Sequence, residues 1–518
     1  GIGATGNWST LTPNVSTGVK SMMQEHFDVV IVGAGLSGIG AACHLQKSCP
    51  GKSYVILESR KAMGGTWDLF RYPGIRSDSD MHTLGYSFKP WIAEKAIAEG
   101  DAILEYIHEA AKEHAVEENI RYHQRVTRAS WSSADSSWTV RTEDPVQGTV
   151  SSFSCNFLLM CAGYYQYKQG FTPEFPGRER FRGEVIHPQL WPEGLDYTDK
   201  KVVIIGSGAT AVTLMPVMAE KAAHVTMLQR SPTYMVSRPF KDAIANFLRK
   251  ILPARWAYAI TRWKNVSLQA WVYKKSRTHP QAMRKRILGW LRKELGPDFD
   301  METHFNPTYN PWDQRLCLVP DSDLFQSLKA GTSSIVTDQI ESFTESGIAL
   351  KSGQELEADI IVTATGLNMV VMGEAAFDVD GVPVDFSKTW TYKGLMYSGV
   401  PNLISTFGYI NASWTLRADL TSQYLCRLLN HMDATGSQAV TPQLRPEDSD
   451  MAARPWIDSF SAGYMQRHMH LFPKQGDRDP WINTQDYKRD KTLLGKDSFD
   501  DGALVFSTTH PTGAMAVA

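Results

Sequence analysis

The sequence has 518 residues, too many for a single hydrophobic core, so we expect two or three domains. Hydrophobic residues make up 42% and charged residues 21%, as in soluble globular proteins, and a net charge of -2 excludes an overall attraction to nucleic acid. The six cysteines show neither metal-ligand spacing nor disulfide density, and no apolar run is long enough to span a membrane. We therefore expect a cytoplasmic protein without a metal site.

Residues 1–23 are rich in small polar residues and lack the apolar core of a signal peptide, which predicts a disordered leader. The first organised element is a short apolar strand at residues 28–32, followed by Gly33, Gly35 and Gly38 and then an Ala-rich helix beginning near Leu36. Such a turn lets the backbone approach a pyrophosphate at the helix N-terminus. The next strand ends in Glu58, 20 residues after Gly38, where an acid accepts ribose hydroxyls, so the turn suits FAD or NAD.

A double glycine and an aromatic follow, with Gly65, Thr66 and Trp67, and a Pro-Gly turn then leads to Asp78. This pattern permits close backbone packing against a planar ring system, although a simple loop over a core patch would look the same. We predict a helix at residues 101–114, strands at 131–141 and 151–160, and an exit from the first domain near residue 165.

A stretch with unusual spacing separates this domain from the next. It contains Phe181, Gly183, His187, Trp191 and Pro192, which fit neither helical nor strand periodicity. Residues at such spacing indicate a functional site, and the alternative is a Pro-rich connector whose aromatic side chains simply pack.

A second strand, turn and helix pattern follows, with Gly206, Gly208, Ala209 and Thr210 in the turn. The strand after it ends in Arg230 and Ser231 rather than an acid. An arginine and a hydroxyl at this position bind a 2′-phosphate that an acid would repel, so the second turn suits NADPH.

Residues 240–296 have a different composition, with four tryptophans among many lysines and arginines and only two acids, Asp242 and Glu294. Their apolar spacing predicts a helical insertion. Three interpretations remain open: a solvated cap whose aromatic side chains pack inward, an electropositive cap that guides NADPH, and a basic amphipathic helix in weak contact with a membrane surface.

Beyond the insertion, Arg315 lies in an apolar segment bounded by prolines, and such an arginine requires a carboxylate or a function. Strands near Ile335 and Ile348 and at residues 359–363 precede a return to the first domain, where Trp414 marks a strand-to-helix turn under a flavin. The predicted fold is α/β, with two Rossmann-like dinucleotide-binding domains and a helical insertion in the second. The predicted boundaries are 24–165 and 364–518 for the FAD domain, 166–239 and 301–363 for the NADPH domain, and 240–300 for the insertion.

With these motifs assembled, the chain resembles the Baeyer–Villiger monooxygenases, a family of class B flavin-dependent monooxygenases. The two Gly-rich turns flank the pattern Phe181-x-Gly183-x-x-x-His187-x-x-x-Trp191-Pro192, and the pattern from Gly64-Gly65-x-Trp67 to Asp78 is also complete. Related N- and S-oxygenating enzymes usually place another aromatic at the position of Trp191. The segment around Arg315 and Trp414 resembles the bacterial subgroup that acts on bulky ketones and sulfides.

The resemblance implies that NADPH reduces FAD and that dioxygen then forms a peroxyflavin, which converts ketones to esters or lactones and sulfides to sulfoxides. By family position Arg315 stabilises the peroxide and Asp78 orients Arg315. His187 and Trp191 are expected to couple the two domains rather than touch the substrate.

One departure concerns Gln314, where many relatives have a lysine that helps to hold the 2′-phosphate. Preference for NADPH then depends mainly on Arg230. Two alternatives stay open: an N- or S-oxygenating flavin monooxygenase without Baeyer–Villiger activity, and a membrane-surface flavin NADPH reductase or sensor.

Overall fold

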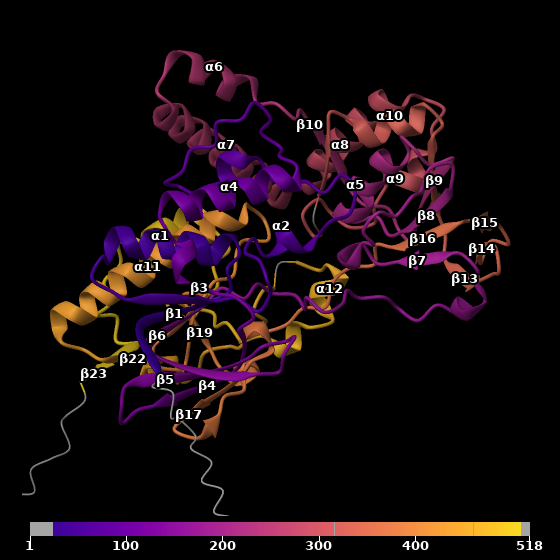
Figure 1. Ribbon diagram of the computed structural model, residues 1–518. Coiled ribbons are helices and arrows are strands. Elements are labelled where there is room, and N and C mark those ends of the chain that lie inside the picture. The colour runs from indigo at the N-terminus through magenta and orange to yellow at the C-terminus, as the bar shows by residue number, and fades with distance from the viewer. Residues whose placement is uncertain (1–23, 315, 459, 509–518) are drawn as a thin grey trace, which may run out of the picture.

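The computed structural model describes residues 24–314, 316–458 and 460–508 (Figure 1). The expected leader, residues 1–23, and the expected catalytic Arg315 lie outside the described residues. The predicted α/β class is confirmed, since helices cover two separate sheets that each contain a strand followed by a Gly-rich turn and a helix.

The first sheet has the order β18-β17-β4-β5-β6-β1-β2-β3, with β21 beside β6. Its strands are β1 (Glu25–Val32), β2 (Tyr54–Leu57), β3 (Ile120–Arg121), β4 (Arg125–Ser132), β5 (Ser137–Glu143), β6 (Val150–Met160), β17 (Ala376–Val379), β18 (Val382–Pro383) and β21 (Leu403–Ser405). The single strand expected over 131–141 is wrong, because a turn at residues 133–136 separates β4 from β5. Three of the nine strands come from the last third of the chain, as the predicted return requires.

Helices lie over one face of this sheet, the first and the last of them in contact with its strands and the others packed on helices (Figure 1). They are α1 (Leu36–Ser48), α2 (Thr66–Leu69), α3 (Met81–Leu84), α4 (Gly100–Glu113) and α11 (Trp414–Thr435). The second half of β1 is fully buried, because it lies between the parallel strands β2 and β6 and under α1.

The second sheet is parallel throughout, in the order β12-β9-β8-β16-β7. Its elements are β7 (Glu184–Ile186), β8 (Lys201–Ile205), α5 (Ala209–Met218), β9 (His224–Gln229), α10 (Asp323–Lys329), β12 (Ser333–Thr337) and β16 (Ile360–Thr363). A small antiparallel sheet extends it, with β13 (Ile340–Phe343), β14 (Gly347–Leu350) and β15 (Glu355–Glu357).

The predicted helical insertion lies between β10 (Met235–Arg238) and β11 (Cys317–Pro320), which pair with each other. It contains α6 (Ala243–Ile251), α7 (Ala254–Thr278), α8 (Pro280–Leu295) and α9 (Met301–Phe305). Inward packing of its tryptophans is wrong for Trp256, Trp263 and Trp271, which are exposed. Only Trp290 packs inward, edge-on to Phe325. Among the described residues no helix has both the length and the apolarity to cross a membrane.

The last third of the chain is mostly irregular, with short elements around α11. They are β19 (Thr391–Tyr392), β20 (Met396–Tyr397), β22 (Ala439–Pro442), α12 (Gly463–Gln466), α13 (Tyr487–Leu493) and β23 (Leu504–Ser507).

Short 3-10 turns, η1 to η7, occur along the described chain. They lie at Glu117–Asn119, Arg178–Arg180, Pro188–Leu190, Met372–Glu374, Phe386–Lys388, Pro446–Asp448 and Met469–Leu471.

Two linkers join the two sheets, one leaving the first unit after β6 and one returning after β16. They run side by side, since the Gln166 amide donates to the Asn368 carbonyl at 2.8 Å and the Phe171 amide to the Gly366 carbonyl at 3.0 Å. The units are therefore connected by a hydrogen-bonded pair of chain segments, which we call the linker pair (residues 164–171 and 366–370).

Candidate functional site

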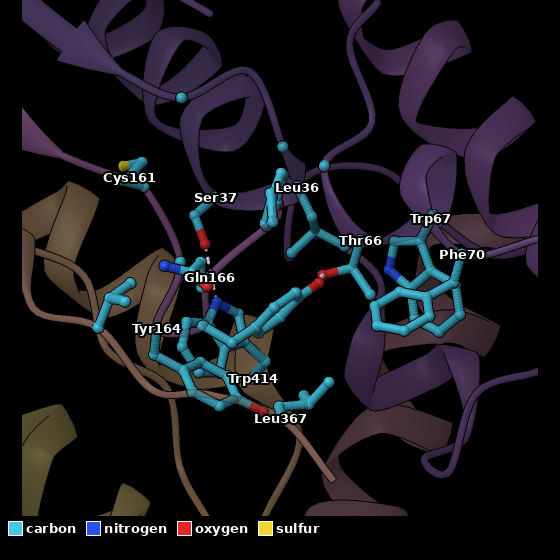
Figure 2. Close-up of a pocket in the computed structure, with 18 of the residues that line it drawn as sticks. Leu36, Ser37, Thr66, Trp67, Phe70, Cys161, Tyr164, Gln166, Leu367 and Trp414 are labelled. Atoms are coloured by element: carbon cyan, nitrogen blue, oxygen red, sulfur yellow. Dashed lines mark hydrogen bonds between the residues drawn. The ribbon is translucent and has the colours of Figure 1, made fainter. Parts of the chain in front are cut away.

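A cavity of about 780 Å³ lies where the two units meet. Its walls come from the first Gly-rich turn, the segment 64–79, the residues after β6 and the N-terminus of α11 (Figure 2). The second unit contributes Ala209, Thr210 and Thr213 of α5, together with Leu318. One space is thus shared by both dinucleotide folds.

The glycines of the first turn are fixed by close backbone contacts. Gly33 has a φ of 104°, and an added Cβ there would lie 2.3 Å from the Cys161 carbonyl oxygen. At Gly38 it would lie 1.9 Å from the Gly33 carbonyl oxygen. These contacts hold β1, β6 and α1 together, whereas Gly35 faces Gly65 across the cavity wall, with a hypothetical Cβ 3.5 Å from the Gly65 Cα.

The N-terminus of α1 suits a phosphate group. Its N-cap is Gly35, no side chain caps it, and its first turn contains no acid. The amides and the helix dipole are therefore free to meet an anion. Glu58 is buried at the end of β2 and lines the cavity, where its carboxylate accepts the Ala34 and Arg60 amides at 2.8 Å each. These bonds fix the carboxylate beside the turn, in a position to receive ribose hydroxyls.

Aromatic side chains cover the floor of the cavity. The Trp414 indole donates to the Ser37 hydroxyl at 2.8 Å and stacks on Tyr164 with ring centroids 5.3 Å apart (Figure 2). The Thr66 hydroxyl bonds the Tyr165 hydroxyl, and Trp67 lies on the same wall. Planar surfaces of this kind fit a ring system, and Gly65 preserves the space, since its Cβ would lie 3.3 Å from the Tyr167 hydroxyl.

The second turn repeats the arrangement at α5. Gly206 has a φ of 130° and packs against Ala364, while an added Cβ at Gly208 would meet nothing within 4 Å. Gly208 caps α5 without a side-chain bond, so the helix N-terminus of Ala209 and Thr210 presents free amides toward the cavity.

Arg230 and Ser231 follow β9 at the carboxyl edge of the second sheet and do not line the cavity. The Ser207 hydroxyl, within the second turn, lies 3.4 Å from the Ser231 carbonyl oxygen, which places the pair beside the turn. Arg230 is exposed and forms no ion pair with a described residue. Its guanidinium is therefore available to a phosphate at the rim.

The segment 72–78 carries polar groups that sequence reasoning missed. The Arg76 guanidinium lines the cavity and forms an ion pair with Asp323 of α10 at 2.5 Å, across the boundary between the units. Burial raises the pKa of the Tyr72 hydroxyl to about 12, although an interaction with Thr210 of α5 opposes this. Gly74, with a φ of 75°, lies against Val217 of α5. The Tyr-Pro-Gly-x-Arg sequence was the available signal for a contact between the units.

Asp78 lines the same cavity. Its predicted partner Arg315 lies outside the described residues. The neighbouring Asp313 is held by an ion pair with Arg277 of α7 at 2.5 Å.

The five residues of the stretch at 181–192 stand apart from the cavity. Phe181 is buried against Phe343, a Cβ at Gly183 would lie 2.2 Å from the Asp359 carbonyl oxygen, and Trp191 packs on the core of the second unit, with Pro192 exposed beside it. This stretch therefore forms the edge strand β7 and its flanks.

His187 contacts both segments of the linker pair. Its Nδ1 accepts the Gln189 amide at 3.1 Å, so its Nε2 carries the proton and donates to the Gly366 carbonyl at 3.0 Å. The ring also packs on Gly170, where a Cβ would lie 2.0 Å from its Cε1. Burial lowers the pKa of His187, although the bonds to Gly366 and Phe171 oppose the shift.

One shared space thus has two uncapped helix N-termini, a buried acid and an aromatic floor around it. This arrangement is that of an oxidoreductase with two dinucleotide-binding folds. Comparison with known proteins gives the family. The model of the flavin-binding monooxygenase-like family matches residues 96–372, more than half of the chain, and that of an NAD(P)-binding Rossmann-like domain matches residues 31–93. The chain belongs to the flavin-binding monooxygenase-like family.

Full-length relatives agree with this membership. The chain is 53% identical over 486 residues to the FAD-containing monooxygenase EthA of Mycobacterium tuberculosis, covering 94% of this chain and 98% of that protein. It is 48% identical over 491 residues to the probable FAD-binding monooxygenase AlmA of Acinetobacter baylyi, with 95% and 98% covered.

The fold is also that of solved monooxygenase structures. An oxidised steroid monooxygenase bound to NADP superposes with a TM-score of 0.68 at 24% identity, over 82% of this chain and 88% of that one. A cyclohexanone monooxygenase from Rhodococcus sp. Phi1 bound to NADP⁺ gives 0.67 at 20% identity, over 82% and 87%.

Proposed function

We propose that this chain is an NADPH- and O2-dependent flavoprotein monooxygenase that converts ketones to esters or lactones and oxidises sulfides to sulfoxides. The observation that carries the proposal is the single cavity between two dinucleotide folds, with the N-termini of α1 and α5 both at its walls. A shared cavity lets one pocket serve both a hydride donor and an organic substrate.

The cofactors are FAD and NADPH. The first turn, Glu58 and the Gly65-Thr66-Trp67 segment would hold FAD, with Trp414 under its ring system. The second turn would hold NADPH, with Arg230 and Ser231 at the 2′-phosphate. When bound, the flavin accepts a hydride and activates dioxygen. In the balanced reaction a ketone, NADPH, a proton and O2 give an ester, NADP⁺ and water.

The residues of the chain bind, orient and exclude water. The stacked Trp414 and Tyr164 make the floor apolar, which strengthens every charge interaction above it. By family position Arg315 stabilises negative charge on oxygen, and Asp78 is its orienting carboxylate. Arg76 links the cavity wall to α10 through Asp323, which supports a role in positioning the second unit over the first.

The relatives support the oxygenase class, and the names of the solved neighbours, a steroid monooxygenase and a cyclohexanone monooxygenase, agree with a ketone substrate. The stretch ending in Trp191-Pro192 has every fixed position of the Baeyer–Villiger family pattern. This favours Baeyer–Villiger activity over N- or S-oxygenation alone.

Turnover of cyclohexanone and thioanisole under labelled dioxygen tests the activity. We expect a lactone and a sulfoxide, each containing one labelled oxygen atom by mass spectrometry. Sulfoxide without lactone would assign the enzyme to the N- or S-oxygenating alternative. NADPH oxidation without any oxygenated product would support the reductase alternative and contradict the proposal.

Replacement of Arg315 tests its role. We expect Arg315→Ala to retain anaerobic flavin reduction by NADPH while product formation falls about 100-fold or more, the usual effect of removing one charge-stabilising donor. Arg315→Lys should restore part of the activity, since it returns the positive charge without the planar fork. Unchanged product formation in the alanine variant would exclude Arg315 from this role.

A further inference from the structure

The outer face of α6 and α7 carries an unusual share of exposed apolar side chains. We define this outer face as Ile244, Phe247, Ile251, Trp256, Ile260, Trp263, Leu268 and Trp271. They are eight of the 16 large exposed hydrophobic residues found in the described part of the chain, and Trp263 is 72% exposed. Figure 1 places α6 at the edge of the molecule, with α7 beneath it.

The two sides of α7 are reversed relative to an ordinary surface helix. The exposed side carries apolar residues at helical spacing, so that they form one stripe along the helix: Trp256, Ile260, Trp263 and Trp271. The buried side is mostly polar, with Ala257 and Tyr258 as its apolar members. There the Arg262 guanidinium donates to the Gly85 carbonyl at 2.7 Å, and the Asn265 amide donates to Asp80 at 2.9 Å. The apolar stripe is therefore not a remnant of core packing, because the helix is anchored through its polar side.

The charge around this face is positive. Residues 243–278 contain eight lysines and arginines and no acid, in a chain whose net charge is -2. Arg262, Lys264 and Arg277 pair with acids elsewhere in the chain. Lys250, Arg255, Lys274 and Lys275 are exposed and form no ion pair with a described residue.

We propose that the outer face of α6 and α7 binds the surface of an anionic lipid bilayer. Phenylalanine and isoleucine side chains would enter the acyl boundary, the tryptophans would lie at the headgroup level, and the unpaired cations would meet lipid phosphates. The contact is peripheral, since in the part of the chain that the structure describes no helix qualifies as a membrane span. Pairing of two copies through this face is less favourable, because it would bring like charges together.

The proposal is tested by cosedimentation of the flavin-loaded enzyme with vesicles. One set contains phosphatidylcholine with about a third phosphatidylglycerol, and the other contains phosphatidylcholine alone. We expect binding to the anionic vesicles that weakens as salt is raised. Equal recovery in the supernatant with both sets would overturn the proposal.

Two double variants separate the apolar and ionic parts of the contact. Trp256→Ser/Trp263→Ser should abolish cosedimentation. Lys250→Gln/Arg255→Gln should weaken partitioning about thirty-fold, for two charges worth about 1 kcal/mol each. The matched control Lys488→Gln/Lys496→Gln removes two exposed cations near the C-terminus and should bind as the parent does. All variants should keep the parent turnover in solution, since none of the substituted residues lines the cavity.

Light scattering of the same variants distinguishes a second copy of the chain as the partner. If the tryptophan variant converts a parent dimer to a monomer while vesicle binding is absent from both, the face joins two copies and the membrane proposal is wrong. A parent that binds anionic vesicles with unchanged oligomeric state supports it.

Discussion

Arg230 is an exposed cation at the carboxyl edge of a parallel sheet, next to an uncapped helix N-terminus. An arginine at that edge meets the adenosine ribose of a dinucleotide bound to the turn. With Gln314 in place of a lysine, it is the main expected contact with a 2′-phosphate.

Arg230→Ala should raise the KM for NADPH about 10-fold or more and leave that for NADH nearly unchanged, since a hydrogen bond to a charged group contributes about 1.5–3 kcal/mol. Steady-state kinetics with both coenzymes measure the ratio. Lys200→Ala, an exposed cation just before β8 at the opposite edge of the sheet, serves as control and should change neither value. Equal increases in the KM values for NADH and NADPH would contradict the assignment of Arg230 to the 2′-phosphate.

His187 is neutral in the folded protein, because its Nδ1 accepts a hydrogen bond and burial lowers its pKa. The ring therefore acts as a spacer between the linkers, and this favours the predicted coupling role over acid–base chemistry.

The lowered pKa of His187 has a consequence for stability against pH. At pH values between the pKa of His187 in the folded protein and its pKa in the unfolded chain, the unfolded chain binds more protons. The contribution of His187 to the free energy of unfolding is therefore fully present above about pH 6.5 and is lost as pH falls through the folded pKa. Burial lowers the pKa values of His82 and His304 in the same direction. The melting temperature should fall less in His187→Gln than in the parent when pH is lowered from about 7.5 to about 5.5. The glutamine side chain can still donate a hydrogen bond to Gly366. The exposed His470→Gln is the control, and an identical loss in all three proteins would exclude a contribution from His187.

At the scale of elements, α7 joins the insertion to the first unit through directional bonds. Burial alone would raise the pKa of Asp419, but the hydrogen bond to His44 and the charge of Arg262 lower it. Arg262 also donates to the carbonyls at the end of α3. The helix is thus held in one orientation by a buried ionic network.

Arg262→Ala should destabilise the flavin-loaded enzyme by about 3 kcal/mol, because removing one partner of a buried pair leaves an uncompensated charge. Arg255→Ala removes an exposed arginine from the same helix and should change the unfolding free energy by less than about 0.5 kcal/mol. Urea unfolding followed by circular dichroism measures both. Equal destabilisation by the two substitutions would show that the network adds nothing.

The sequence predicted the elements whose signals are local. We could predict the turns at Gly33 and Gly206, the helix after Trp414 and the insertion. Their signals, glycine spacing and hydrophobic periodicity, lie in consecutive residues of the sequence. The orientation of α7 was not, since its apolar stripe gives the same period whether it faces the core or the solvent. The Arg76–Asp323 ion pair joins residues 247 positions apart, and no local pattern encodes such a pairing.

At the scale of the whole molecule, the stretch at 181–192 lies where the two units are joined. Its strand β7 edges the second sheet, and His187 rests on the linker pair. A shift of the second unit relative to the first would therefore displace this stretch.

Trp191→Ala should lower the ratio of oxygenated product to NADPH consumed by several-fold, because a smaller side chain loosens the packing of the segment after β7 on the core of the second unit. Hydrogen peroxide release should rise correspondingly. Leu190→Ala truncates an exposed neighbour and should keep the parent ratio. Full coupling in the tryptophan variant would refute a role of the stretch in domain coupling.

The division of the first sheet between the two ends of the chain bears on biosynthesis. Strands β1 to β6 leave the ribosome first, but β17, β18, β21 and α11 follow only after the whole second sheet has been made. The second unit, a continuous insertion, can close while the first still lacks three strands and the helix that packs on α1. The cavity, whose floor includes Trp414 of α11, can therefore be completed only after the second unit has been synthesised.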